Sequence, residues 1–412
     1  MPDSNTAPVQ NTTGGYGLLK INVFRENVAQ PAQNAEVSIL DPDSGRVIEQ
    51  AKTDSEGQLP PVRLTSPPIE NSQDYNGERP FNQYNMRVRL SDFNDAAIDN
   101  VQIYPNTTAI QNVSLTPKTQ DIVIPYPVLW GDFPDKIPES EIKKLPFPSN
   151  LVVLPEPVVP SVIVVHAGVP TDNTAANYTV SFKDYIKNVA SSEIYASWPK
   201  ETLKANILAI ISFTLSRVYT EWYRSKGYDF TITNSTAYDQ AFTYGRNVFQ
   251  EISDIVDEVF TMYITRSDIN QPLFTQYSDG IRVRRDGWLS QWGSKELGER
   301  GYSAIQILRQ YYGYDILLKE AKKVEGVPLS FTGTLSIGSR GEPVRTIQNQ
   351  LNRISNNYPL IPKLVADGIY GEKTAESVRK FQEIFDLPVT GTVNFPTWYA
   401  ISDIYNAVTF YT

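Results

Sequence analysis

One glutamate in the middle of the chain lies where an apolar helix face should continue. Phe182, Ile186 and Val189 recur at helical spacing. Glu193 follows Phe182 by eleven residues and Ile186 by seven, so at about 100° per residue it falls within about 20° of both. Burial raises the pKa of a carboxyl group above its ordinary value of about 4.3, which suits a general acid near neutral pH. A carboxylate that continued this buried face could therefore act as a proton donor.

Two other positions of Glu193 stay open on this pattern. Either the helix ends before Glu193 and the side chain reaches water, or the carboxylate caps the next helix. Trp198-Pro199 ends the segment, because a proline disfavours helical backbone in the residue before it. The elements that must position the carboxylate are helices predicted over Phe182–Ile194 and Lys200–Ser225.

A second group of residues with possible binding chemistry lies in the last fifth of the chain. The loop Asp367-Gly-Ile-Tyr-Gly371 places an aromatic side chain between glycines in a turn-forming sequence. Two helices are predicted around it from apolar residues at helical spacing: Val344, Ile347, Leu351, Val378, Phe381 and Phe385. A compact bundle without a ligand would have the same apolar stripes, so the loop is the feature that favours binding.

Composition excludes several kinds of site. The chain has no cysteine and a single histidine, His166, which excludes disulfides, thiolate metal sites, His-rich metal centres and most triads with a histidine base. We therefore expect no metal and no cofactor, and we expect His166 to be a strand residue without a catalytic part. The formal net charge of −9 disfavours binding to nucleic acid or to an anionic membrane.

The N-terminal residues 1–16 are polar, and we expect them to be disordered. They lack the basic and apolar parts of a cleaved secretory signal. No apolar run in the chain approaches the length of a membrane span. A soluble protein without a classical signal peptide is therefore expected.

The wider pattern predicts a multidomain fold with an N-terminal all-β sandwich, a central α+β domain and a small C-terminal α-helical bundle. Short alternating runs separated by turn clusters over residues 17–118 predict the sandwich, which resembles transthyretin-like or carboxypeptidase-regulatory-like modules. Frequent prolines over 119–160 predict an irregular linker that is accessible to proteases. The central domain is assigned to 161–327 and the bundle to 328–412. Within the central domain we expect strands at Ser161–Val165, Ile255–Phe260 and Pro272–Tyr277, and a third helix at Ser303–Tyr312.

The C-terminal sequence resembles the small helical peptidoglycan-binding domain found at the ends of many cell-wall enzymes. That family has a Gly-x-x-Gly-x-x-Val-x-x-hydrophobic-Gln-x-x-Leu helix, then Asp-Gly-x-Tyr/Phe-Gly, a helix ending in Phe-Gln and a Thr-Gly turn. This chain fills these positions in order. The resemblance implies peptidoglycan as a partner and assigns its binding to five residues: Asp367, Tyr370, Phe381, Gln382 and Trp398.

The segment around Glu193 resembles the active-site region of the stage II sporulation protein D family. Members carry a Tyr-hydrophobic-x-x-Val-x-x-x-Glu helix followed by Trp-Pro-x-Glu-x-Leu-Lys-Ala, which here runs from Tyr185 through Glu193 to Ala205. A second family segment, Gly-x-Ser-Gln-x-Gly-Ala, is matched in part by residues 287–294. The resemblance implies substrate binding by this segment and by a Ser/Gly loop before it, through Tyr277, Ser290, Gln291 and Trp292.

The chain departs from that family at several positions. In the second segment, Trp288 stands in place of a glycine and Ser294 in place of an alanine. The Cys/His metal ligands of the family are absent, and Arg284-Arg285-Asp286 precedes the Ser-Gln motif where a histidine is expected. These departures put any metal role in doubt.

The stage II D family cleaves glycan strands as lytic transglycosylases. The resemblance implies that Glu193 protonates the glycosidic oxygen while the C6 hydroxyl of muramic acid attacks the anomeric carbon and leaves a 1,6-anhydro end. Hydrolytic glycosidases ordinarily need two carboxylates. Asp184 lies on the opposite helix face from Glu193, and the pattern does not place the remaining candidates, which are Asp257, Glu258 and Asp279.

The order of the segments along the whole chain resembles the clostridial type of spore cortex-lytic enzyme. The resemblance implies a proenzyme whose N-terminal part is removed by a subtilisin-like protease during germination, with the cut near residues 150–155. It also implies a place in the spore, in the cortex or coat region. The alternative is a non-catalytic peptidoglycan-binding structural protein of the spore. An amidase or peptidase is disfavoured because it needs a Zn²⁺ site or a Ser or Cys nucleophile with histidine.

Overall fold

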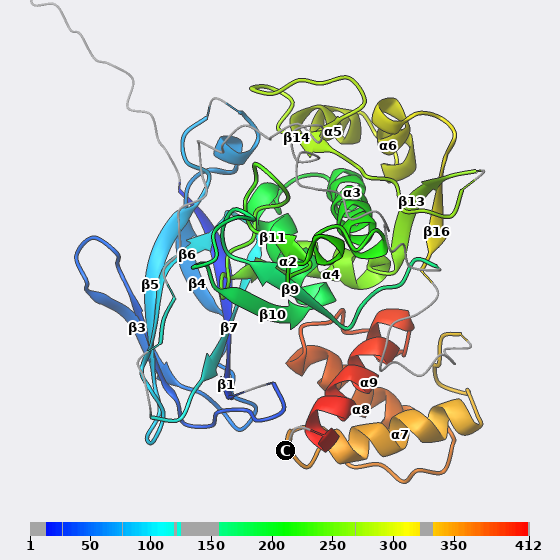
Figure 1. The fold of residues 1–412 in the computed structure, drawn as a ribbon. Helices are drawn as coiled ribbons and strands as arrows, with labels where there is room; N and C mark the ends of the chain where they lie inside the picture. Colours follow the sequence, from blue (N-terminus) through cyan, green and yellow to red (C-terminus); the bar gives the residue numbers. More distant parts are fainter. Residues whose placement is uncertain are drawn as a thin grey trace, which may run out of the picture.

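The computed structural model describes residues 14–26, 28–75, 77–118, 122–124, 156–267, 269–321 and 333–410. It shows a multidomain chain of mixed α/β structure (Figure 1). We refer to its parts as the N-terminal module (residues 14–118 together with 122–124), the central region (156–321) and the C-terminal region (333–410). Within the described residues, no helix is both long and apolar enough to cross a membrane.

The N-terminal module contains strands of two sheets. One sheet has the order β12-β7-β1-β4 and the other the order β3-β2-β5-β6-β8. The strands are β1 (Gly15–Arg25), β2 (Glu36–Leu40), β3 (Val47–Lys52), β4 (Val62–Ser66), β5 (Asn82–Arg89), β6 (Ala96–Ile103), β7 (Thr108–Leu115) and β8 (Ile122–Ile124). Alternate residues point inward, as in β5, where Tyr84, Met86 and Val88 are buried. The inward side chains of both sheets belong to one apolar core.

Strand β12 (Val248–Phe249) comes from the central region but pairs with the module. It runs antiparallel to β7, with Val248 opposite Ile110 and Phe249 opposite Ala109. The ring of Phe249 is buried in the same apolar core as the module strands. The module and the central region therefore share a sheet and a core.

The boundaries at the module differ slightly from the expected ones. Strand β1 begins at Gly15, inside the stretch predicted to be disordered, and β8 pairs with β6 inside the predicted linker. Residues 1–13, 119–121 and 125–155, which hold most of these two predicted segments and the expected protease site, lie outside the described residues.

The central region packs around one long helix. Its helices are α2 (Phe182–Glu193), α3 (Lys200–Tyr219), α4 (Gln250–Val259), α5 (Gln291–Glu299) and α6 (Ala304–Tyr312). Its other strands are β9 (Val162–His166), β10 (Asn177–Ser181), β11 (Ile232–Thr233), β13 (Met262–Arg266), β14 (Tyr277–Ser278), β15 (Leu289–Ser290) and β16 (Ile316–Glu320). Helix α3 is buried over most of its length, because apolar residues occupy all of its sides and α2, α4, α5 and α6 pack around it.

Three expected elements of the central region are confirmed and three are corrected. The strand near Val162 and the helices at Phe182 and Ala304 are present. The strand expected at Ile255–Phe260 is wrong: this stretch lies in α4 and its cap, because Ile252, Ile255, Val256 and Val259 are buried at helical spacing. Helix α3 ends at Tyr219 rather than Ser225, and only Tyr277 of the expected strand at Pro272–Tyr277 is in a strand.

The C-terminal region is formed by the helices α7 (Glu342–Ile354), α8 (Glu372–Ile384) and α9 (Phe395–Phe410). Their apolar faces form a second core that is separate from the first. Ala29 of the N-terminal module is buried in this second core, and its carbonyl accepts a hydrogen bond from Asn357 over 2.9 Å. The neighbouring carbonyl of Val28 accepts one from the Tyr358 hydroxyl.

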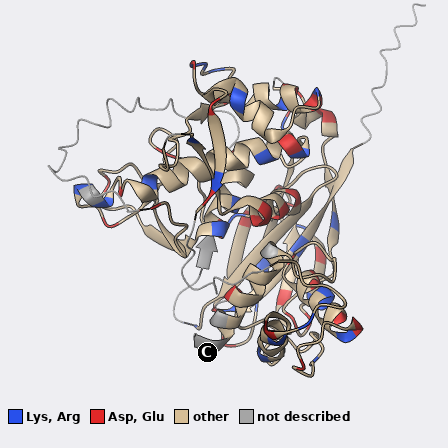
Figure 2. Cartoon of the chain, turned by 90° about the vertical axis from the view of Figure 1, so that its right-hand side faces the viewer, with Lys and Arg blue, Asp and Glu red and all other residues tan. Residues whose placement is uncertain are grey.

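Asp386 joins all three parts of the chain. Its side chain pairs with Lys20 over 2.8 Å and accepts a hydrogen bond from Asn22 over 3.0 Å, both on β1. Its carbonyl accepts a hydrogen bond from Gln250, at the start of α4. Across the described residues, Figure 2 shows acidic and basic residues interspersed rather than separated into one acidic and one basic part.

Candidate active site

Glu193 is the last residue of α2, and its carboxylate is turned inward. The backbone N–H of Ala241 donates a hydrogen bond to Oε1 over 2.8 Å, and Oε2 is shielded from solvent. The helix stops there because Ile194 adopts extended backbone angles. The buried face of α2 carries Phe182, Ile186 and Val189, as the spacing predicts. Of the three positions left open by the sequence, the structure shows a carboxylate at the end of the buried face.

The segment 239–243 faces α2 and is fixed to it by side chains. The Asn188 side-chain amide donates to the Thr243 carbonyl over 2.7 Å and accepts from the Thr243 N–H over 3.0 Å. Together with the bond from Ala241 to Glu193, these contacts hold the segment along the helix. The sequence analysis did not identify this segment, because its partners on α2 lie about fifty residues earlier in the chain.

Gln240 is fully buried and uses both ends of its amide group. Its Oε1 accepts a hydrogen bond from the Tyr185 hydroxyl over 3.0 Å and lies 2.8 Å from the Thr214 hydroxyl. Its Nε2 donates to the Ile210 carbonyl over 3.2 Å and to the Tyr277 hydroxyl over 3.1 Å. All hydrogen-bonding capacity of the amide is therefore used, which ties α2, α3 and β14 to a single side chain.

Tyr277 connects this network to the carboxylate. Its hydroxyl accepts from Gln240 and donates to the side chain of Glu193. Burial raises the pKa of Tyr277 well above its ordinary range, and the Glu193 carboxylate raises this pKa further. Tyr277 therefore keeps its proton and stays a donor toward Glu193 at every physiological pH.

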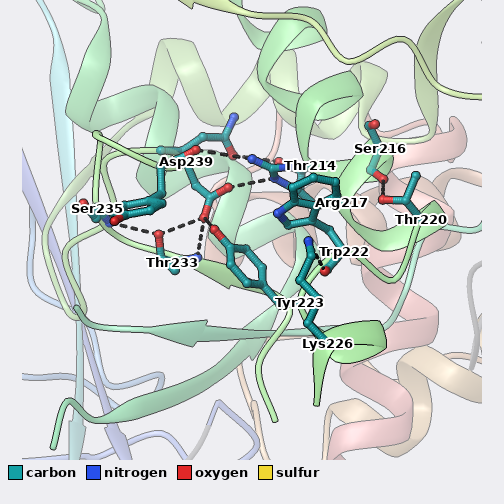
Figure 3. Close-up of polar contacts among 12 residues, drawn as sticks. Thr214, Ser216, Arg217, Thr220, Trp222, Tyr223, Lys226, Thr233, Ser235 and Asp239 are labelled. Carbon is teal, nitrogen blue, oxygen red and sulfur yellow. Dashed lines mark hydrogen bonds and ion pairs between the residues drawn. The ribbon is translucent and has the colours of Figure 1, made fainter. Parts of the chain in front are cut away.

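Asp239 anchors the start of the segment through a buried ion pair. Arg217 on α3 donates through Nε to the Asp239 carboxylate over 2.8 Å, and both side chains are almost completely buried. The other carboxylate oxygen accepts from the Tyr223 hydroxyl over 2.7 Å and from the Thr233 N–H over 3.0 Å. Figure 3 shows Asp239 between Arg217 on one side and Thr233 and Tyr223 on the other. The arrangement fixes the backbone immediately before Gln240.

The carboxylates that the sequence could not place have other partners. Asp257 pairs with Lys183 over 2.9 Å and with Lys187 over 3.0 Å. Glu258 pairs with Lys204. Asp279 accepts from the backbone N–H groups of residues 281, 282 and 283, and Asp184 is exposed on the first turn of α2. Asp257, Glu258 and Asp279 are therefore engaged by groups other than Glu193, and Asp184 lies on the exposed side of α2.

Strands β14 and β15 bring two predicted substrate-binding residues to adjacent positions. The strands run parallel, with Tyr277 opposite Leu289 and Ser278 opposite Ser290. Ser290 caps α5, and its side chain accepts from the Gly293 N–H over 2.9 Å. Gln291 and Trp292 follow in the first turn of α5, both partly exposed. Tyr277 is buried, so it acts on Glu193 rather than on a ligand in this structure.

Trp292 belongs to an aromatic cluster that the sequence analysis did not find as a unit. Its ring centroid lies 5.8 Å from that of Tyr195 and 5.0 Å from that of Trp198, and the centroids of Tyr195 and Trp198 are 5.3 Å apart. Trp198 also lines a pocket of about 540 Å³ whose far wall includes Pro388 and Pro396 of the C-terminal region. The signal in the sequence was the dense aromatic content between residues 195 and 198.

In the C-terminal region, most residues assigned to wall binding by resemblance are buried. Tyr370, Phe381, Gln382 and Trp398 lie in the core, whereas Asp367 is exposed. Backbone donation from Ile369, followed by donation from Gln348, lowers the pKa of Asp367. Among these five residues, only Asp367 offers its side chain to a polymer outside the domain.

Two buried glutamines hold the loops of this region in the same way. Gln348 on α7 donates to the Ile369 carbonyl over 3.1 Å and accepts from the Gly368 N–H over 2.8 Å. Gln382 on α8 donates to the Thr392 carbonyl over 2.9 Å and accepts from the Gly391 N–H over 2.9 Å. The Gln positions of the motif therefore shape the loops.

His166 contacts other side chains of the fold. It lies in β9, its Nδ1 is 2.8 Å from the side-chain oxygen of Asn177, and its ring stacks on Phe230 at 4.5 Å. In the part of the chain that the structure describes, no group of three or more His, Cys, Asp or Glu side chains is arranged to hold a metal ion.

Two family models match the chain. The stage II sporulation protein model matches residues 171–265, which include Glu193 and the segment 239–243. The peptidoglycan binding domain model matches residues 340–401. The pair fits a spore cortex-lytic enzyme with a peptidoglycan-binding domain, makes peptidoglycan a partner, and indicates a sporulation-related function at the cell wall. The second predicted motif, at 287–294, lies beyond the matched residues.

Solved structures add only weak likenesses. The SleB N-terminal domain is 28% identical over 18% of this chain and 99% of that chain, with a TM-score of 0.16. Catechol 1,2-dioxygenase from Acinetobacter sp. ADP1 is 16% identical over 28% of this chain and 60% of that chain, with a TM-score of 0.18. Likenesses at these TM-scores carry no argument about this chain. None of the curated proteins compared with the chain matches it.

Proposed function

We propose that this protein cleaves the glycan strands of spore cortex peptidoglycan by lytic transglycosylation, with Glu193 as the general acid. The observation that carries the proposal is a single carboxylate at the end of a buried helix face, set by Ala241 and Tyr277. Asp257 and Glu258 are ion-paired, Asp279 accepts backbone hydrogen bonds and Asp184 is exposed. Hydrolytic glycosidases ordinarily need two cooperating carboxylates, so one carboxylate suits a reaction in which the substrate supplies its own nucleophile.

In the proposed reaction, the Glu193 proton passes to the glycosidic oxygen as the bond from that oxygen to the anomeric carbon breaks. The C6 hydroxyl of the same muramic acid residue forms the new bond to the anomeric carbon. The proton of that hydroxyl returns to the carboxylate, which restores the acid without adding water. Tyr277, Gln240 and Asn188 are positioning residues, because they act on Glu193 or on the segment that holds it.

We further propose that the protein is a proenzyme that acts during germination. A subtilisin-like protease would cut within residues 119–160 and release the N-terminal module. The shielded Glu193 carboxylate and the close packing of the module on the central region support an inactive uncleaved form. The peptidoglycan-binding domain would hold the enzyme on the cortex.

The rival function is a non-catalytic wall-binding protein of the spore, and the missing Cys/His ligands of the family favour it. Release of muropeptides from decoated spores separates the two. Activated wild-type protein should release them, Glu193→Gln should lose nearly all release, and Asp184→Asn, on the exposed side of the same helix, should keep it. Equal release by wild type and Glu193→Gln would contradict the proposed acid.

A further inference from the structure

We propose that Tyr195, Trp198 and Trp292 form a saccharide-binding platform beside Glu193, and that a loop of the N-terminal module occupies this platform in the uncleaved chain. We define this loop as residues 67–81, between β4 and β5. The inference deepens the proposed function and rests on it, because it assigns the substrate subsite and the means by which the module blocks it.

The three rings are arranged as a continuous aromatic surface. Each ring centroid lies between 5.0 and 5.8 Å from the other two, and the pairs meet edge to face. Such a surface presents ring faces and edges in different directions and gives large contact area at a low cost in side-chain entropy. The apolar C–H face of a sugar ring packs on surfaces of this kind.

The platform is tied to the general acid by short connections. Tyr195 follows Glu193 by two residues, where the chain leaves α2. Trp292 follows β15, which pairs with the strand that begins at Tyr277, the donor to Glu193. The backbone N–H of Trp292 also donates a hydrogen bond to the Asp279 carbonyl over 3.2 Å. A sugar bound on the platform therefore lies within a few residues of the acid on two sides.

The loop of the module lies against this platform. The indole N–H of Trp198 donates to the Ser72 carbonyl over 3.0 Å, and the hydroxyls of Ser197 and Ser72 are 2.7 Å apart. The ring of Tyr75 meets that of Trp292 edge to face at 5.7 Å, and Trp198 is only 4% exposed. The loop therefore covers the platform with one amide carbonyl and one aromatic ring.

These two groups indicate the class of ligand that the loop excludes. The acceptor that Trp198 holds is an amide carbonyl, and the N-acetyl group of an amino sugar carries the same acceptor. The ring of Tyr75 lies where an apolar sugar face would pack on Trp292. The platform therefore fits an N-acetylated saccharide, and the loop supplies the same contacts in its place.

No described side chain of residues 69–79 belongs to the apolar core of the module, so this part of the loop can be replaced while Phe81 keeps its place in the core. The ends of the loop meet, since the Asn82 side chain donates to the Thr65 carbonyl over 3.2 Å, and compact surface loops with adjacent ends tolerate shortening. The Tyr75 hydroxyl is buried and has no hydrogen-bond partner among the described residues. An unsatisfied buried hydroxyl costs about 1–3 kcal/mol, which weakens the contact of the loop with the platform.

The test uses the full-length chain and the N-acetylglucosamine tetramer as a probe, with binding measured by calorimetry. Replacing residues 69–79 by three glycines should tighten binding by at least about tenfold relative to wild type. Adding Trp292→Ala to the shortened loop should reverse this gain. Adding Tyr314→Ala, at an exposed aromatic residue outside the cluster, should leave it unchanged.

Equal affinity of wild type and the shortened-loop protein, or a gain that survives Trp292→Ala, would overturn the proposal. Thermal unfolding checks that each variant is folded. If the shortened protein does not fold, the test is repeated with the double variant Gln73→Ala/Tyr75→Ala, which keeps the loop backbone. Binding needs no catalysis. A shortened-loop protein that binds the tetramer but releases no muropeptides even after cleavage within residues 119–160 would overturn the proposed function and support the platform, whereas release without binding would overturn the platform.

Discussion

The backbone N–H of Ala241 donates a hydrogen bond to Oε1 of Glu193 over 2.8 Å. This contact joins the end of α2 to the segment 239–243, which is held in turn by Asn188 and by the ion pair between Asp239 and Arg217. The position of the carboxylate therefore depends on buried polar groups on α2 and α3. Their removal should affect both folding and catalysis.

Gln240→Ala should reduce both stability and activity. It removes the partner of the Tyr185 and Tyr277 hydroxyls, and leaving buried polar groups unsatisfied costs about 2–4 kcal/mol together with the cavity. Under conditions where the variant stays folded, kcat should fall about tenfold or more because Tyr277 is no longer fixed against Glu193. Chemical denaturation and muropeptide release measure the two effects. Gln310→Ala on the exposed side of α6 is the matched control, and equal losses in both variants would contradict the role of Gln240.

Asp239→Asn should destabilise the protein by about 3–5 kcal/mol, because it leaves the Arg217 charge buried without its partner. Glu221→Gln removes a longer and more exposed contact, with Arg224 at 3.8 Å, and should change the free energy of unfolding by less than about 1 kcal/mol. Urea denaturation followed by circular dichroism compares the two. A similar small effect of both changes would show that the buried pair does not hold the segment.

Glu56→Gln should stabilise the protein at pH 7.5 and lose this effect in acid. Glu56 is buried between the module and the C-terminal region and accepts from the Leu360 N–H over 3.0 Å. Burial raises the pKa of Glu56, Asp54 raises this pKa further, and Lys380 opposes the rise. The folded state therefore favours the protonated form of Glu56. The contribution of Glu56 to the free energy of unfolding is fully present below its ordinary pKa, and it is lost as the pH rises through the pKa that Glu56 has in the folded protein.

The melting temperature of Glu56→Gln should exceed that of wild type by roughly 1–3 °C at pH 7.5, and the difference should vanish near pH 4. Glu49→Gln, at an exposed position of β3, is the control and should show no such dependence. A gain that is the same at both pH values would contradict the assignment of burial as the cause.

Residues 333–412 should fold alone and co-sediment with purified peptidoglycan. The three helices have a core of their own, and fewer than about one hundred residues suffice for a small independent domain. Gln382→Ala should impair folding and thereby binding, because it frees the loop that holds Gly391 and Thr392. Asn349→Ala, at an exposed position of α7, should bind as wild type. A folded wild-type fragment that stays in solution would count against wall binding by this region.

A protein that begins near Val152 should digest cortex faster than the full-length chain on the same decoated spores. Removal of the module uncovers Trp198, whose indole N–H is bonded to Ser72 in the uncleaved chain. The same shortened protein with Glu193→Gln shows whether the gain is enzymatic. Equal rates for the full-length and shortened proteins would contradict the proenzyme hypothesis.

Local periodicity was sufficient to predict α2 and its buried face, but it left three positions open for Glu193. It failed at α4, where a window limited to Ile255–Phe260 hid the helical spacing that begins at Ile252. Strand β12 has only two residues, and its pairing with β7 is set by tertiary contact rather than by its own sequence. Gln240 was missed for the same reason, since its partners lie on α2, α3 and β14.

The motif resemblance named two families whose models match parts of the chain, but it did not give the role of every residue within the motifs. Phe381, Gln382 and Trp398 belong to the pattern that resembles a wall-binding domain, yet they are buried and shape its core and loops. A motif records residues needed for folding together with residues needed for binding. Only burial in the folded structure separates the two.

The central claim is cleavage by Glu193 with the muramic acid C6 hydroxyl as nucleophile. It is tested most directly by digestion of purified cortex in heavy-oxygen water, with mass spectrometry of the released glycan ends. Lytic transglycosylation predicts 1,6-anhydro ends, lighter by one water than reducing ends and free of heavy oxygen, and their loss in Glu193→Gln. Reducing ends that carry heavy oxygen would show hydrolysis and contradict it, as would anhydro ends released equally by Glu193→Gln.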